Sequence, residues 1–308
     1  MRDFIKINSK IKKFEKIIQV PGDKSISIRW IMLASLAIGV SKSKNLLESG
    51  DVKSAINAMK KLGIKILKKK NFHYVYGKGL NGLKIKKNLV IDAGNSGTFA
   101  RLFCGLISGY EEEITLKGDK SLSQRDFSRV MKPLKLFGVN FKSKNNKLPI
   151  KILGSSFLRP IYYLEKKGSA QVKSAILLSS LNTPGKTVID CIKSRDHTEL
   201  MLKKSLRLPI KIKKQKNTDK IEIYGKKNFY SFDYDIPGDI SSAAFFIVLT
   251  ILSKNSELLI KNVNLNKTRS GIIDIIRKMG GSIKILNRTI YKGEYRGDIL
   301  VKSTNYLK

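Results

Sequence analysis

The sequence predicts an α/β fold built from repeated units and divided into two domains. Three observations support this prediction. Short loops rich in Gly and Ser recur at a regular interval, each loop leads directly into an apolar run, and β-branched segments typical of strands lie between these runs. A chain of 308 residues is also long for a single hydrophobic core.

The recurring loops set the period of the repeat. They span residues 20–27, 93–98, 168–171 and 236–242, and their glycines at positions 22, 94, 168 and 238 are 72, 74 and 70 residues apart. The N-terminus of a helix presents unpaired N–H groups and a favourable dipole to anions, so each loop is either an anion-binding site or an ordinary helix cap. Four loops in register, two of them with Lys or Arg nearby, favour anion binding.

A second feature keeps the same period. Amphipathic helices that run into β-branched segments are predicted at 51–66, 124–141, 198–212 and 268–285. A Gly follows the helix in every copy except the third. Strands are predicted at 74–76, 89–92, 187–189, 221–224 and 299–302. Each unit is therefore expected to run strand, helix, strand, helix, strands.

The charge balance is strongly basic. The chain has 61 Lys and Arg against 24 Asp and Glu, a formal net charge of +37, which suggests nucleic acid, an anionic membrane or polyanionic substrates as partners. The Lys residues are spread along the chain, and no helix-turn-helix, RNP-like, zinc-finger or basic-zipper pattern is present. The excess of Lys, Ile and Asn is also typical of an A/T-biased genome. Nucleic-acid binding is therefore the weaker hypothesis.

Several other classes of protein and site are disfavoured. The apolar runs at 30–40 and 243–252 are too short to span a bilayer, and the N-terminus has no signal-like apolar region, so we expect a cytoplasmic protein. Cys104 and Cys191 lie in apolar stretches and are expected to be buried thiols, with no metal site. His73 and His197 are expected to be structural.

Several motifs together carry a resemblance to a known family. They are Pro21–Arg29, Gly94–Thr98, Arg125, Ser169–Gln171, Ser194–Glu199 and Pro237–Ala244. This set, from about Val20 to the end of the chain, resembles the 5-enolpyruvylshikimate-3-phosphate (EPSP) synthases, also called 3-phosphoshikimate 1-carboxyvinyltransferases. The sibling UDP-N-acetylglucosamine enolpyruvyl transferases share the repeat but resemble this sequence less in three of the motifs.

The resemblance implies an activity and an architecture. The family transfers the enolpyruvyl group of phosphoenolpyruvate to the 5-hydroxyl of shikimate 3-phosphate in aromatic amino acid biosynthesis, without cofactor or metal. Its fold has two domains of βαβαββ units, with helices inside and sheets outward. We expect one complete three-repeat domain at 20–228, on the shikimate 3-phosphate side, and a partial domain with one repeat at 1–19 plus 229–308.

The resemblance also assigns residues to the two substrates, with Lys24 touching both and acting in catalysis. The residues implied for shikimate 3-phosphate are Lys24, Ser25, Arg29, Ser169, Ala170 through its backbone, Gln171 and Ser194, assisted by Arg195. Those implied for phosphoenolpyruvate are Lys24, Gly97, Arg125 and Gln171, with Asn95 shaping the loop.

The sequence also departs from the family pattern. Asp126 stands where Pro usually follows the phosphoenolpyruvate arginine, and Ile28 stands where a polar residue is common. We expect only four of six repeats, without the family's catalytic Asp, its Lys-Glu pair and further Arg residues. A non-catalytic or partner-dependent remnant that binds shikimate 3-phosphate is therefore an alternative, and self-association or a complementing chain are expected routes to a complete site.

Overall fold

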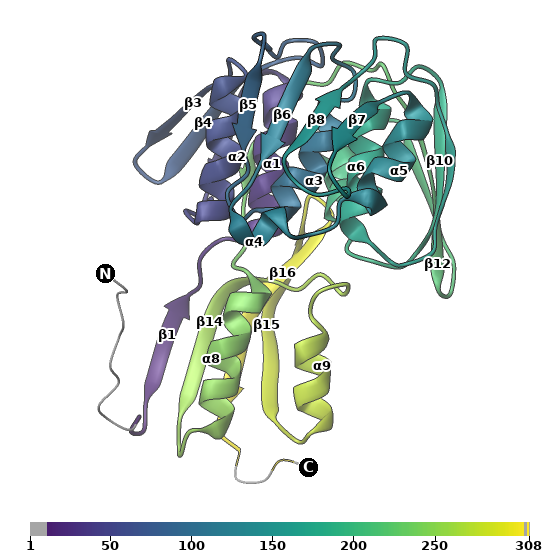
Figure 1. The fold of residues 1–308 in the computed structure, drawn as a ribbon. Helices are drawn as coiled ribbons and strands as arrows, with labels where there is room; N and C mark the ends of the chain where they lie inside the picture. Colours follow the sequence, from purple (N-terminus) through teal and green to yellow (C-terminus); the bar gives the residue numbers. More distant parts are fainter. Residues whose placement is uncertain (1–10, 305–306, 308) are drawn as a thin grey trace. The chain divides into compact units, whose positions relative to one another are not determined.

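A computed structural model describes residues 11–304 and 307 of the chain. The chain divides into two compact units. The larger unit is Gly22–Ile236, and the smaller unit joins Met1–Pro21 to Pro237–Lys308. Each is an α/β unit in which helices pack against mixed sheets (Figure 1).

The described residues form four sheets of four strands, and all four sheets have the same topology. In each sheet one edge strand pairs in parallel with its neighbour, and the other pairs are antiparallel. The larger unit holds the sheets β13 (Tyr234–Asp235)-β2 (Ile38–Lys44)-β4 (Phe72–Lys78)-β3 (Lys65–Lys69), β5 (Leu89–Asp92)-β6 (Glu113–Lys117)-β8 (Ile150–Leu153)-β7 (Asn140–Ser143) and β11 (Ile210–Lys214)-β12 (Thr218–Tyr224)-β10 (Lys186–Ile192)-β9 (Tyr162–Glu165). The smaller unit holds β1 (Glu15–Gln19)-β14 (Glu257–Asn264)-β16 (Glu294–Lys302)-β15 (Ser282–Tyr291).

Each repeat contributes two helical segments to its sheet. The first helices, which follow the Gly- and Ser-rich loops, are α1 (Lys24–Leu36), α3 (Gly97–Leu106), α6 (Ala170–Leu181) and α8 (Ile240–Leu252). The second segments are α2 (Gly50–Lys61), α5 (Ser128–Phe137), α7 (His197–Leu200) with the π-helix η1 (Met201–Ser205), and α9 (Gly271–Lys278); a short helix α4 (Lys120–Ser123) precedes α5. The predicted strands fall within observed strands, and each range predicted for a second helix overlaps an observed helix and the start of the strand that follows it.

The edge strands of the first and fourth repeats are exchanged. In chain order β1 precedes α1 as β5 precedes α3, but β1 pairs with β14 of the fourth repeat. The edge strand beside β2 is instead β13, which comes just before α8 in the sequence. The expected boundary after residue 228 was therefore too early. Residues 229–236 belong to the larger unit, because they hydrogen-bond along β2.

The third repeat ends its second helical segment without glycine. At the end of α5, Gly138 adopts φ +110° and its N–H donates to the Leu134 and Lys135 carbonyls. In the third copy Arg207 takes a left-handed conformation, with φ +52°. A residue with a side chain tolerates this conformation at some cost in backbone energy, which glycine avoids.

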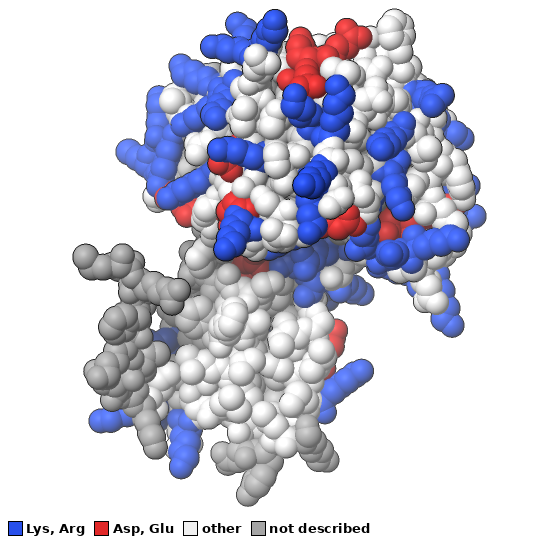
Figure 2. Space-filling view, in the orientation of Figure 1, with Lys and Arg blue, Asp and Glu red and all other residues white. Residues whose placement is uncertain are grey.

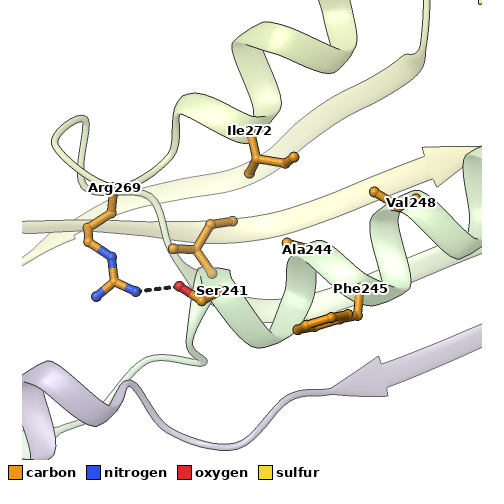
Figure 3. Close-up of a pocket in the computed structure, with 7 residues that line it drawn as sticks. Ser241, Ala244, Phe245, Val248, Arg269 and Ile272 are labelled. Carbon is orange, nitrogen blue, oxygen red and sulfur yellow. Dashed lines mark hydrogen bonds between the residues drawn. The ribbon is translucent and has the colours of Figure 1, made fainter.

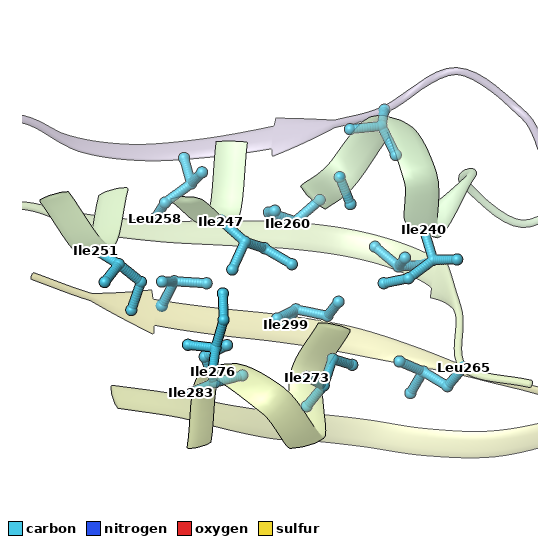
Figure 4. Packing of buried hydrophobic residues seen from close by; sticks show 14 residues of the cluster. Ile240, Ile247, Ile251, Leu258, Ile260, Leu265, Ile273, Ile276, Ile283 and Ile299 are labelled. Atoms are coloured by element: carbon cyan, nitrogen blue, oxygen red, sulfur yellow. The ribbon is translucent and has the colours of Figure 1, made fainter. Parts of the chain in front are cut away.

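The cores of the two units differ in how fully they enclose their helices. In the larger unit every residue of α1 from Ser25 to Leu36 is buried, including Trp30, whose Nε1 donates to the Phe232 carbonyl at 3.4 Å. In the smaller unit α8 and α9 cover one face of the sheet with a cluster rich in isoleucine (Figure 4). The opposite side of α8 is apolar and exposed, and Phe245 there is 79% exposed.

The surface charge is dispersed. On the face shown in Figure 2, Lys and Arg side chains spread over the larger unit among acidic and neutral residues. Within residues 11–304, no helix combines the length and the apolar character needed to cross a bilayer.

Candidate active site

Three buried helices of the larger unit begin at residues implied in substrate binding. Helices α1, α3 and α6 start at Lys24, Gly97 and Ala170. Asp23, Ser96 and Ser169 cap them, accepting hydrogen bonds from the N–H groups of Ile26 (3.1 Å), Phe99 (3.4 Å) and Val172 (3.4 Å). The loops are therefore genuine caps, and the helix N-termini also retain the positive dipole that favours anions.

Side-chain hydrogen bonds tie these helix starts together. Gln171 Nε2 of α6 donates to Thr98 Oγ1 of α3 at 3.1 Å. Arg29 Nη2 of α1 donates to Ser174 Oγ of α6 at 2.9 Å. The expected residues Lys24, Gly97, Ala170 and Gln171 are thus carried by three helices that are linked near their N-termini.

Lys24 is a partly exposed cation at the start of α1. Its side chain is 43% exposed, and Nζ lies 3.4 Å from Asp51 Oδ2 of α2. An ion pair at this exposure is weak, because water screens it. The contact with Asp51 therefore leaves the ammonium able to meet an anionic ligand.

Arg29 is buried rather than displayed on a surface. Its Nη1 donates to the Ser25 carbonyl at 2.9 Å, and its Nε donates to Thr198 Oγ1 at 2.7 Å. Ser174 Oγ and Thr198 Oγ1 are 2.7 Å apart, which closes a hydrogen-bonded triangle around the guanidinium. This geometry connects α1, α6 and α7 and supports the backbone at Ser25.

Gly97 and Arg125 lie close together, as the resemblance implies. A Cβ on Gly97 would lie 3.0 Å from Arg125 Nη1 and 2.9 Å from Arg101 Nη1, so glycine leaves the space that both guanidinium groups occupy. Arg125 Nη2 donates to Asn95 Oδ1 at 3.1 Å, and Asn95 Nδ2 donates to Asp119 Oδ2 at 2.7 Å. Asn95 therefore orients Arg125.

Sequence reasoning missed Arg101, which lies four residues after Gly97 on the same face of α3. Its Nη1 donates to the Gly97 carbonyl at 3.2 Å, and its guanidinium stacks on Phe127. Burial lowers the pKa of Arg101, and the like charge of Arg125 lowers it further. The helical spacing of four from Gly97 was the available signal.

The two departures from the family pattern have local explanations. Asp126 accepts hydrogen bonds from the N–H of Ser128 at 2.9 Å and from its hydroxyl. These bonds hold the pKa of Asp126 below its usual value, so its carboxylate is engaged at the start of α5. Ile28 is fully buried in α1 and contributes to the core.

The remaining implied residues surround α6 and α7. The Ser169 N–H donates to Glu165 Oε2 at 2.9 Å, which fixes the loop before α6. Ser194 lies in the turn before α7, and its Oγ is buried without a hydrogen-bond partner in the described chain. An unsatisfied buried hydroxyl is costly, so this group is suited to a bound ligand. Arg195 follows it in the same turn and is exposed.

The other titratable groups fit structural roles. Burial raises the pKa of Cys104 to about 12 and that of Cys191 to about 11, so both are buried thiols. His73 is buried in β4, and burial lowers its pKa. His197 is buried at the start of α7. In the described part of the chain, no three His, Cys, Asp or Glu side chains gather as a metal ion would require.

A cavity of about 600 Å³ lies in the smaller unit, and its lining includes Ile240, Ser241 and Ala244 of the Pro237–Ala244 motif. Its wall is the apolar side of α8, including Ala244, Phe245 and Val248 (Figure 3). Arg269 at its rim donates to Ser241 Oγ at 2.7 Å and pairs with Asp239 at 3.0 Å. The cavity is therefore largely apolar, unlike the helix starts of the larger unit.

The fold and the site together define a class of protein. It is a repeated α/β protein whose larger unit carries Lys and Arg side chains beside helix N-termini, groups that favour anions. The chain belongs to the EPSP synthase (3-phosphoshikimate 1-carboxyvinyltransferase) family, whose model matches residues 8–304. The family expected from the motifs is therefore confirmed.

Individual relatives agree with this family. The 3-phosphoshikimate 1-carboxyvinyltransferase of Thermodesulfovibrio yellowstonii is 45% identical over 306 residues, which are 98% of this chain and 70% of that protein. The protein of the same name from Caldicellulosiruptor saccharolyticus is 44% identical, over 97% of this chain and 70% of that protein. A solved EPSP synthase from Acinetobacter baumannii matches with a TM-score of 0.84 and 35% identity, over 94% of this chain and 65% of that chain.

These matches also bear on the expected architecture. The α/β fold of the EPSP synthases is confirmed. The expectations of a missing C-terminal third and an incomplete second domain are not confirmed by matches that extend over 98% of this chain. The chain spans 65% of the length of the solved Acinetobacter baumannii protein. The roles of the individual site residues stay predictions.

Proposed function

We propose that this chain carries out the reaction for which its relatives are named, as a transferase of the shikimate pathway. The enolpyruvyl group of phosphoenolpyruvate is transferred to the 5-hydroxyl of shikimate 3-phosphate, and phosphate is released. One observation carries the proposal. Three capped helix N-termini, which begin at Lys24, Gly97 and Ala170, are linked by side-chain hydrogen bonds within one unit. Both substrates are strongly anionic, and this arrangement suits them.

In this proposal the two substrates divide the site between them. Shikimate 3-phosphate is held at the starts of α1 and α6 and by the Ser194 turn, where a buried hydroxyl lacks a partner. Phosphoenolpyruvate is held by Arg125, oriented through Asn95, beside Gly97. The ammonium of Lys24 contacts both substrates. It stabilises the negative charge on the oxygens of the phosphate group as that group leaves.

Binding of shikimate 3-phosphate without turnover is the second candidate function. The residues proposed for the site are cations and neutral donors, whereas removal of the hydroxyl proton requires a base, which commonly contributes about 10²- to 10⁴-fold in rate. A chain without such a base would bind the substrate and turn it over slowly.

The deciding experiment measures phosphate release by the purified chain with both substrates, beside calorimetric binding of shikimate 3-phosphate alone. We expect turnover that falls about 10²- to 10³-fold in Lys24→Ala. Lys151→Ala is the matched control, because Lys151 forms a comparable exposed ion pair with Glu113 at 2.8 Å on an outer sheet. Equal activity of Lys24→Ala and the wild type would refute the proposal, and binding without turnover would favour the second candidate.

Nucleic-acid binding has the weakest support. It predicts sequence-independent binding of DNA with a steep dependence on salt, yet the basic residues on the face shown in Figure 2 are dispersed rather than gathered into a groove. The cytoplasmic location and any self-association or complementing chain stay predictions.

A further inference from the structure

A buried ion pair joins the two helices that flank the proposed phosphate site. Lys173 of α6 and Glu199 of α7 are 0% and 2% exposed, and Nζ lies 2.6 Å from Oε1. Removing two charges from water is costly, and apolar residues of similar volume often stabilise a protein equally well. The pair therefore invites an explanation other than stability.

A neighbouring residue on each helix makes a second polar contact. Ser174 follows Lys173, Thr198 precedes Glu199, and the Ser174 and Thr198 hydroxyl oxygens are 2.7 Å apart. Arg29 of α1 donates to both of these hydroxyls. Two adjacent contacts fix the axial position of α7 along α6, which a purely apolar contact would define less sharply.

The segment held in this way carries the Ser194 turn. Helix α7 (His197–Leu200) runs directly into η1 (Met201–Ser205), and a helical segment of this length is not stable without tertiary contacts. The Lys193 N–H donates to the Asn217 carbonyl at 3.1 Å, and the Leu200 N–H donates to the Asp196 carbonyl at 3.0 Å. Ser194 therefore lies between the backbone bond of Lys193 on one side and α7 on the other, so the position of its Oγ depends in part on what anchors α7.

We propose that Lys173 and Glu199 are positioning residues, whose ion pair holds α7 and the preceding turn so that Ser194 meets the phosphate of shikimate 3-phosphate. The inference rests on the proposed function, because that function supplies the ligand. Neither residue touches substrate, and both act through Ser194.

The test replaces the pair by apolar residues of similar volume, in the double variant Lys173→Met with Glu199→Leu. We expect the variant to fold with an unfolding midpoint near that of the wild type. We expect its dissociation constant for shikimate 3-phosphate to rise about tenfold or more. Hydrogen exchange of the amides at 193–197, measured without substrate, is expected to accelerate. The matched control is Lys151→Met with Glu113→Leu, an exposed pair that we expect to change neither readout.

The outcomes separate the two proposals. Unchanged affinity and unchanged exchange in the folded double variant would overturn the positioning role. If the wild type itself fails to bind shikimate 3-phosphate, the proposed function fails, and exchange at 193–197 still decides whether the pair fixes the turn. If the double variant does not fold, Lys173→Met with Glu199→Gln takes its place with the same two readouts, because it removes both charges and keeps the shape of the Glu199 side chain.

Discussion

The same repeat is buried to different degrees in the two units. Helices α3 and α8 occupy equivalent positions in their repeats, each following a capped loop and covering a sheet of the same topology. Helix α3 packs against α6 and is buried over most of its length, whereas α8 is buried on one side only. The difference teaches that an apolar helix of this repeat is enclosed by its counterparts in neighbouring repeats, and not by its own sheet.

The largest expected effect comes from truncating one aromatic residue in each of these two helices. Phe103→Ala removes a fully buried side chain from α3 and should cost about 3–5 kcal/mol in the free energy of unfolding. Phe245→Ala removes an exposed side chain from α8 and should change it by no more than about 0.5 kcal/mol. Denaturant unfolding of both variants measures the contrast, and similar losses at the two sites would break the comparison.

A smaller effect is expected where two helices of the larger unit touch. A Cβ on Gly105 of α3 would lie 2.1 Å from the Ala175 carbonyl oxygen of α6. Gly105→Ala should therefore separate the helices and cost about 1–3 kcal/mol. Gly271→Ala at the start of α9 is the control, since a Cβ there meets nothing within 4 Å and the change should stay within about 0.5 kcal/mol. Thermal unfolding compares the two, and a harmless Gly105→Ala would contradict the close packing.

The smallest expected effect concerns the pH dependence of the smaller unit. Burial alone would raise the pKa of Asp298, but hydrogen bonds from the Asn262 N–H, Asn287 and Lys261 outweigh it and leave that pKa lowered. The unfolded chain thus binds the proton more readily, so Asp298 stabilises the fold above its ordinary value of 3.8, and this contribution is lost as the pH falls through the folded pKa.

Asp298→Asn should accordingly cost about 1–2 kcal/mol at neutral pH and show a weaker acid dependence than the wild type. Urea unfolding at several pH values between neutral and acid measures both effects. Glu113→Gln is the control in the larger unit, because Glu113 forms an exposed ion pair that contributes little. If the free energy of unfolding of Asp298→Asn depends on acid pH as that of the wild type does, this carboxylate does not contribute to the pH dependence of stability.

The repeat could be predicted because its signals are local. The spacing of the glycines and the apolar periods mark the helix starts within a few residues, and the strands follow from β-branched runs. The exchange of β1 and β13 could not be predicted. Strand β1 pairs with β14, which lies more than 200 residues away in the sequence. Nothing in the β1 segment Glu15–Gln19 indicates that it pairs with β14 rather than with the nearer strand β2.

The candidate site could be predicted as a set of residues but not as a geometry. The motifs pointed to Arg29, yet its burial depends on Ser174 and Thr198, which are 145 and 169 residues away. Arg101 was missed because no motif contains it, although it approaches Gly97 as closely as Arg125 does. The burial of Arg29 and the position of Arg101 beside Gly97 both result from tertiary contacts, which the sequence motifs do not contain.

The single tryptophan gives the chain a built-in optical label. Trp30 is buried in α1, and its indole N–H is bonded to the Phe232 carbonyl within the larger unit. Its fluorescence therefore reports on unfolding of that unit, while the smaller unit unfolds without a tryptophan signal. Far-ultraviolet circular dichroism registers the helices and strands of both. Unfolding that changes the circular dichroism but not the tryptophan fluorescence therefore reports on the smaller unit, and no added dye is needed.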